Sequence, residues 1–335
     1  MADMGQSNQE FLNNVLQKLH GNLEAKFKKF VDDQIRAIEE TKVKIKKRKG
    51  VIHFIRIFPH FATAVETMLA SSSTSAIADP SLPVRRMVDR EYDRILKSMF
   101  DSLKVIAREN PALAPAATLA STSSSAVADP EDKEALNFHI LLIENMNHFL
   151  EEAIDASRSG GSREVLDDWR DAAQREMAEH MGQYLNAVMR RPLGKLLEYL
   201  ENIEAQLQGG KSGGAVAAQP SNSKSVFNKV LGGYDGREVR KGIEALRKRV
   251  EKHFGEEEGG GLGVPGLPGA VGTGGGGGGS SNSSLVNRVT RECERFYGDV
   301  GLRIGRVTTD VYGGDVLFEW PRAEVRSAFA IAGAR

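Results

Sequence analysis

The sequence lacks the residues on which several classes of protein depend. It holds one cysteine in 335 residues, Cys293, which excludes a disulfide framework and any multi-cysteine zinc or iron–sulfur site. Aromatic residues make up only 7% of the chain, and 45 Lys and Arg balance 45 Asp and Glu. No net charge is therefore available for nonspecific binding to nucleic acid, and we expect no nucleic-acid partner. The uncharged stretch 110–128 contains two prolines and is too weakly apolar to cross a membrane.

Helical periodicity dominates what remains. No segment shows a convincing period-2 strand bounded by hairpin turns, so the pattern predicts an all-α fold. Ser7 and Glu10 match an S-x-x-E capping box, which predicts the start of a long first helix. Its apolar stripe recurs at spacings of four and three and consists of Phe11, Val15, Leu19, Leu23, Phe27, Val31, Ile35 and Ile38.

Proline, glycine and serine divide the chain into segments. Asp129-Pro130 is typical of a helix start, whereas Pro59 and Pro192 are expected to kink or bend the helices that contain them. The predicted segments are 1–70 (long helix, basic run and kinked helix), 71–83 (linker), 84–108 (helix), 109–129 (disordered linker), 130–208 (helical bundle), 209–223 (linker), 224–254 (helices), 255–284 (Gly-rich disordered insertion) and 285–335 (C-terminal helices).

Motifs that would indicate catalysis or a bound cofactor are weak. The segment 209–212 reads GGKS, but Ala205 stands where a phosphate-binding loop needs glycine, and a helix precedes it where a strand is needed. His139 and His148 are nine residues apart, which is not a metal-ligand spacing. Cys293 lies on an apolar helical stripe and is predicted to be a buried small hydrophobe. We therefore expect no enzyme activity, no cofactor, no metal site and no small-molecule substrate.

The densest charge cluster is a basic run after the first helix, which consists of Lys42, Lys44, Lys46, Lys47, Arg48 and Lys49. Such a run can contact anionic lipid headgroups with about 1 kcal/mol per charge, contact the phosphates of nucleic acid, or act as an import signal. It can also be a solvated helix end whose cations complement the helix dipole. We favour this interpretation slightly over a binding role. Liposome sedimentation before and after charge reversal of the run would test lipid binding, and no change would remove that hypothesis.

Several segments, taken in chain order, carry a resemblance to a known family. They are NLEAKF from Asn22, IKKRKGVIHFIRIFPHFATAVE over 45–66, NFHILLIENMNHFLE over 137–151, MAEHMGQYLNAVMRRPLGKLL over 177–197, SKSVFNKVL over 223–231 and RKRVEKHFG over 247–255. These segments resemble the C-terminal helical region of the fungal form of exocyst complex component one. The resemblance covers roughly 9–329 apart from the linkers.

The resemblance implies a fold of tandem helical bundles stacked as an elongated rod. It also implies a structural subunit that, with other exocyst subunits, tethers secretory vesicles to the plasma membrane before fusion. Such a protein is cytoplasmic and peripherally associated with the plasma membrane at sites of secretion. The phosphoinositide-binding half of that family has no counterpart in these residues, so we do not expect membrane targeting through it.

An alternative hypothesis is a peripheral membrane-binding helical module that acts through the basic run on anionic phospholipids. The two hypotheses differ in salt dependence. Apolar helix-face contacts should survive moderate salt, whereas polybasic lipid binding should fade once the Debye length falls to about 8 Å and below.

Overall fold

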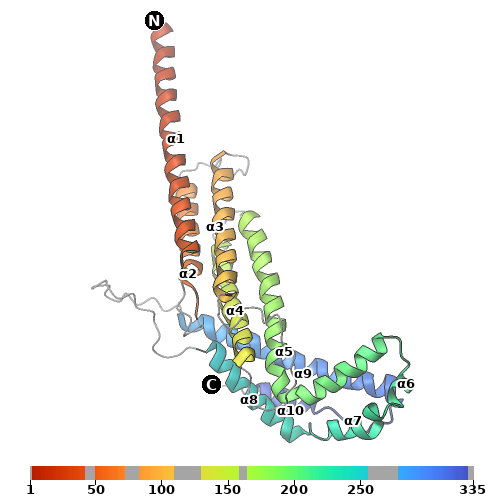
Figure 1. Ribbon diagram of the computed structural model, residues 1–335. Coiled ribbons are helices and arrows are strands. Elements are labelled where there is room, and N and C mark those ends of the chain that lie inside the picture. Colours follow the sequence, from red (N-terminus) through yellow and green to blue (C-terminus); the bar gives the residue numbers. More distant parts are fainter. Residues whose placement is uncertain are drawn as a thin grey trace. The chain divides into compact units, whose positions relative to one another are not determined.

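The computed structural model describes residues 2–41, 50–71, 83–108, 130–157, 164–255 and 278–330. These residues form ten α-helices and one short 3-10 helix, with no β-strand among them (Figure 1). The predicted all-α fold is therefore confirmed, while its stacking as a rod stays a prediction. Among the helices that are described, none combines the length and the apolarity that crossing a bilayer would need.

The chain divides into two compact units. Unit 1 comprises Met1–Val127 and Asn145–Glu176, and unit 2 comprises Ala128–Glu144 and Met177–Arg335. Helices α4 and α5 contribute residues to both units.

Unit 1 contains three whole helices and parts of two others. They are α1 (Ala2–Glu39), α2 (His53–Ser71), α3 (Pro83–Arg108), the C-terminal part of α4 (Pro130–Ser157) and the N-terminal part of α5 (Glu164–Gln208). Helix α1 begins at Ala2, so the predicted start at the Ser7 capping box is wrong by about one and a half turns. Helix α2 continues through Pro59.

A chain of aromatic rings joins the helices of unit 1. Phe58 of α2 meets Tyr92 of α3 edge-to-face at 6.0 Å and lies 6.4 Å from Phe149 of α4. Phe100 of α3 lies 5.5 Å from Phe149 and 5.0 Å from Trp169 of α5. Such pairs stabilise a core by about 0.5–1.5 kcal/mol each beyond the area they bury.

Unit 2 is built from the N-terminal part of α4, the rest of α5 and the elements that follow α5. These are α6 (Gly213–Ala217), the 3-10 helix η1 (Pro220–Asn222), α7 (Lys224–Leu231), α8 (Gly236–Phe254), α9 (Gly278–Tyr312) and α10 (Arg322–Ala330). Asp235 caps α8 by accepting a hydrogen bond of 2.8 Å from the Glu238 backbone N–H, which satisfies one of the free donors of the first turn.

The range 209–223, expected to be a linker, holds α6 and η1. The Ser212 hydroxyl caps α6 by accepting from the Ala215 backbone N–H at 3.4 Å, and the Val216 side chain is fully buried. Gly213 lies so close to the Asp310 backbone of α9 that no side chain fits between them. Small residues at this point permit a close approach to α9, which a linker of the same composition would not need.

Most of the residues predicted to form the other linkers and the Gly-rich insertion are not described by the structure. The segments 72–82, 109–129 and 256–277 lie outside the described residues, but the backbone is helical from Gly278, so the expected disorder over 278–284 is wrong.

Helix α5 is continuous through Pro192, and its ribbon changes direction sharply along its length (Figure 1). The missing N–H of a proline inside a helix accounts for such a bend.

Candidate protein-interaction site

The C-terminal half of α1 is fixed to α3 in unit 1. Val31 and Ile38 of α1 are buried, and Asp32 Oδ1 forms an ion pair of 2.6 Å with Nη2 of Arg94 on α3. The same Arg94 pairs through Nη1 with Glu91, whose carboxylate is almost completely buried. The Arg94 guanidinium therefore neutralises the buried carboxylate of Glu91 and also connects α1 to α3 through Asp32.

The N-terminal half of α1 presents large apolar side chains to solvent. Their exposed fractions run from 36% at Val15 to 71% at Phe11. We call this surface the α1 face, and its members are Phe11, Leu12, Val15, Leu16, Leu19 and Leu23.

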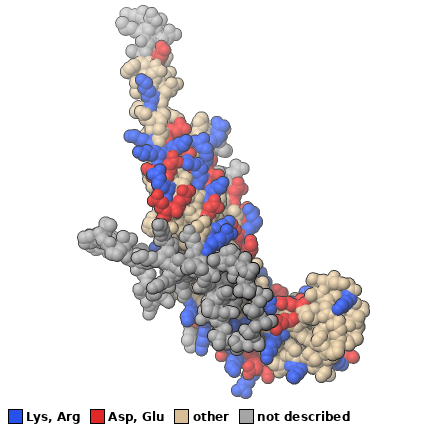
Figure 2. All heavy atoms as spheres, in the orientation of Figure 1, with Lys and Arg blue, Asp and Glu red and all other residues tan. Residues whose placement is uncertain are grey.

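The α1 face extends beyond the helices that cover the rest of α1. Figure 1 shows α1 running well past the ends of α2 and α3, its neighbours in unit 1. On the side shown in Figure 2, this projecting part carries few charged side chains, whereas Lys, Arg, Asp and Glu gather lower down, over α1 and α3. Apolar side chains clustered in this way mark an interaction surface, because scattered single ones would need no explanation.

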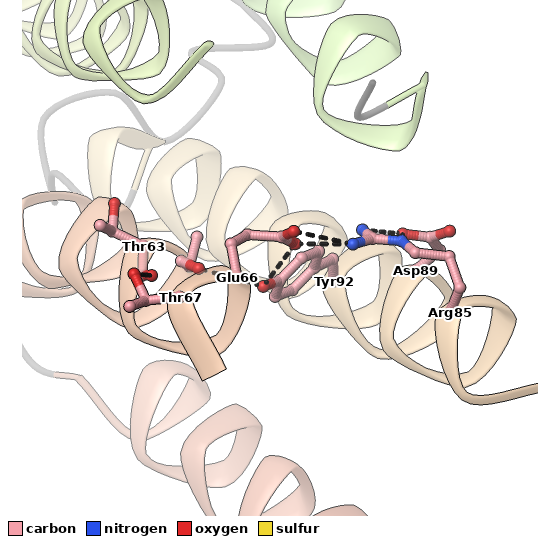
Figure 3. Close-up of polar contacts among 7 residues, drawn as sticks. Thr63, Glu66, Thr67, Arg85, Asp89 and Tyr92 are labelled. Carbon is pink, nitrogen blue, oxygen red and sulfur yellow. Dashed lines mark hydrogen bonds and ion pairs between the residues drawn. The ribbon is translucent and has the colours of Figure 1, made fainter. Parts of the chain in front are cut away.

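A buried polar cluster connects α2 to α3 in unit 1 (Figure 3). Arg85 Nη1 donates to both carboxylate oxygens of Glu66 at 2.9 and 2.8 Å, and Arg85 Nε donates to Asp89 at 2.9 Å. The Tyr92 hydroxyl lies 3.2 Å from Glu66 Oε1 and 3.3 Å from the Ala62 carbonyl oxygen. Burial alone would lower the pKa of Arg85, but its hydrogen bonds to Asp89 and Glu66 outweigh burial and raise that pKa, so the cluster holds a permanent charge.

The motifs considered in the sequence have separate outcomes in the structure. The basic run 42–49 lies outside the described residues, so its role stays a prediction. The 209–212 segment forms the turn between α5 and α6, where Gly210 has φ 85° and Lys211 Nζ donates to Gln206 at 3.0 Å. Cys293 is buried, and burial raises the pKa of its thiol to about 12, as expected for a packing residue. Within the described residues no group of three or more His, Cys, Asp or Glu could hold a metal ion.

A histidine pair in unit 2 was not visible in the sequence. Nδ1 of His139 on α4 lies 3.2 Å from Nδ1 of His180 on α5, and Phe138 packs edge-on against both rings. Burial, assisted by the nearby His180, lowers the pKa of His139 to about 4. The two residues are 41 positions apart, and no spacing rule connects them.

The histidine pair predicts a pH-dependent stability of unit 2. His139 is neutral in the folded protein but protonates near pH 6.5 when unfolded, so the unfolded state binds more protons between pH 6.5 and 4. The free energy of unfolding should therefore fall as the pH falls through this window. Urea denaturation at several pH values should show a weaker fall for His139→Asn than for the wild type or for His20→Asn, which alters an exposed histidine of α1. Identical pH profiles for all three proteins would contradict the prediction.

The described residues define an all-α protein that presents an apolar helix face, with no metal centre among them. Comparison with known proteins identifies the family. Residues 1–314 match the family model described as "Exocyst complex component Sec3, C-terminal", and the chain belongs to this family.

Two curated relatives agree with the family assignment. The chain is 25% identical over 248 residues to exocyst complex component 1 of Mus musculus and 23% identical over 232 residues to that of Drosophila melanogaster. These matches cover 74% and 69% of this chain but only 24% and 22% of the relatives. The chain thus spans about a quarter of the length of these relatives. No solved structure matches.

Proposed function

We propose that this chain is a structural, non-catalytic part of an exocyst subunit that helps to tether secretory vesicles to the plasma membrane before fusion. It would act on the cytoplasmic side of that membrane by holding other exocyst subunits through helix faces. The exposed α1 face is the observation that carries this proposal, because a family member with such a surface has a physical means of assembly.

The chemistry of the α1 face supports a protein partner. Its six members are apolar, and burying large side chains of this kind contributes about 1.5–3 kcal/mol each. Helix packing between subunits uses this driving force without any reacting group. A contact of this type is also insensitive to moderate salt, because it does not depend on charge.

An affinity pull-down of the tagged full chain from a lysate of secreting cells tests the proposal. Mass spectrometry should identify other exocyst subunits, and their recovery should persist as salt is raised moderately. The matched control is the tag alone from the same lysate. Absence of every exocyst subunit at low and moderate salt would refute an assembly role for this chain.

The lipid-binding alternative depends on the basic run, Lys42 to Lys49, which the structure does not describe. No contact or charge of the described residues favours it over the exocyst role. It stays a prediction from the sequence, and its salt dependence separates it from assembly through apolar helix faces.

A further inference from the structure

The α1 face has the residue spacing of a surface that receives another helix. Leu12, Leu16, Leu19 and Leu23, which we call the leucine seam, follow one another at intervals of four, three and four residues. This is the spacing of the core positions of a coiled coil, in which each leucine fits between side chains of a facing helix. The seam is about 18 Å long at 1.5 Å per residue.

The leucine seam continues a contact that already exists in unit 1. Phe30 lies seven residues after Leu23 and therefore on the same line of the helix. Its ring lies 5.9 Å from Phe61 of α2. Helix α2 thus contacts this line at Phe30, which remains 45% exposed, and a docked helix would lie on the same side of α1, further toward its N-terminus.

One edge of the seam is basic. Lys18 and Lys29 fall at helical spacing from Val15, on the same side of α1, and Lys26 follows Leu23 by three residues at the end of the seam. All three side chains are exposed, and none forms an ion pair with a carboxylate in the described part of the chain. A partner with Asp or Glu along the facing edge would be favoured there.

A second copy of this chain fits the seam poorly. In a parallel pair Lys26, which continues the seam after Leu23, would lie against Lys26 of the copy, and like charges at such positions destabilise the pair. An antiparallel pair that matches leucine to leucine would place the first turns of the copy against Phe30, where Phe61 already packs. A second copy of this chain is therefore an unfavourable occupant of the seam.

We infer that the α1 face docks one amphipathic helix of another exocyst subunit. That helix carries a leucine-type seam and a row of carboxylates along the edge that meets Lys18, Lys26 and Lys29. This inference rests on the proposed function, since it names the kind of partner helix that the α1 face takes.

A charge placed in the seam should weaken the contact. Leu16→Glu would bury a carboxylate among apolar side chains, so recovery of the partner subunit by the full chain should fall at least about tenfold. The matched control is Asn14→Glu, which adds the same charge on the opposite side of α1 and should leave recovery unchanged. Leu16 is 53% exposed, so circular dichroism and thermal melting should match the wild type for both variants.

Reversing the basic edge should have a smaller effect. Lys26→Glu combined with Lys29→Glu should lower recovery about threefold, as expected for two exposed ion pairs. Lys28→Glu, on the same line of the helix as Asn14, is the control and should have no effect. Equal recovery of all variants would overturn the charge complementarity.

Site-specific photo-crosslinking identifies the occupant directly. A benzoylphenylalanine at position 19 should crosslink to a helical, leucine- and acid-rich segment of another exocyst subunit, and one at position 14 should not. Suppose that exocyst subunits co-purify with the wild-type chain. Crosslinking to a second copy, or equal crosslinking from both positions, would then overturn the inference but leave the proposed function standing. If the wild-type chain recovers no subunit, the proposed function fails and the inference fails with it.

Discussion

Replacing Arg85 with alanine should lower the free energy of unfolding by about 3 kcal/mol, because it removes one partner of a buried ion pair. The Arg85 side chain is 10% exposed and that of Glu66 14%. Without the guanidinium, the Glu66 carboxylate loses the two hydrogen bonds that Arg85 Nη1 donates to it. Equilibrium denaturation in urea, followed by circular dichroism, measures the loss.

An exposed ion pair on the same unit provides the control. Arg36 and Asp33 lie three residues apart on α1, with side chains 68% and 50% exposed. Arg36→Ala should change the free energy of unfolding by less than about 0.5 kcal/mol, because solvent screens such pairs. If Arg85→Ala were as mild as Arg36→Ala, the polar cluster would not hold α2 against α3.

This cluster also shows what the sequence could not reveal. Glu66 and Arg85 are nineteen residues apart on different helices, and 72–82 between them lies outside the described residues. Periodicity predicts which side of a helix is apolar, but it does not say which carboxylate a basic residue will meet. Pairing of this kind is decided by the way helices cross, which a one-dimensional pattern does not contain.

The first helix gives a second example. Its apolar stripe runs from Phe11 to Ile38 without interruption, so the pattern predicts one continuous helix, and the structure confirms it. Yet Val31 and Ile38 are buried, whereas Leu19 and Leu23 are exposed. The difference depends on how far α2 and α3 reach along α1, and the candidate site is the part of the stripe that they leave uncovered.

Other features were predictable because their cause is local. Cys293 sits on an apolar stripe and is buried as expected, and helix α10 follows Trp320-Pro321 as the proline predicts. The contact between Gly213 and Asp310 is not local. A glycine that permits a close approach looks the same in a sequence as a glycine in a linker, which is why the range 209–223 was expected to be a linker.

A close approach of this kind also predicts opposite effects for two glycines of α9. A Cβ added at Gly301 would lie 2.6 Å from Cδ1 of Trp320, whereas one added at Gly305 would meet nothing within 4 Å. Gly301→Ala should therefore displace the indole ring and destabilise unit 2 by about 1–2 kcal/mol net, after the gain in helix propensity. Gly305→Ala should stabilise it by up to about 1 kcal/mol, because alanine loses less backbone entropy.

The buried indole ring of Trp320 is the reason why a side chain at position 301 should be destabilising. Trp320 is 5% exposed and lies 6.3 Å from Tyr297, which in turn meets Phe329 of α10 edge-to-face at 5.7 Å. A shift of Trp320 would thus disturb the packing of α10 on α9, and tryptophan fluorescence should report the displacement together with the change in urea midpoint. Stabilisation of unit 2 by Gly301→Ala as well as by Gly305→Ala would mean that the ring moves without cost and that close packing at Gly301 does not stabilise unit 2.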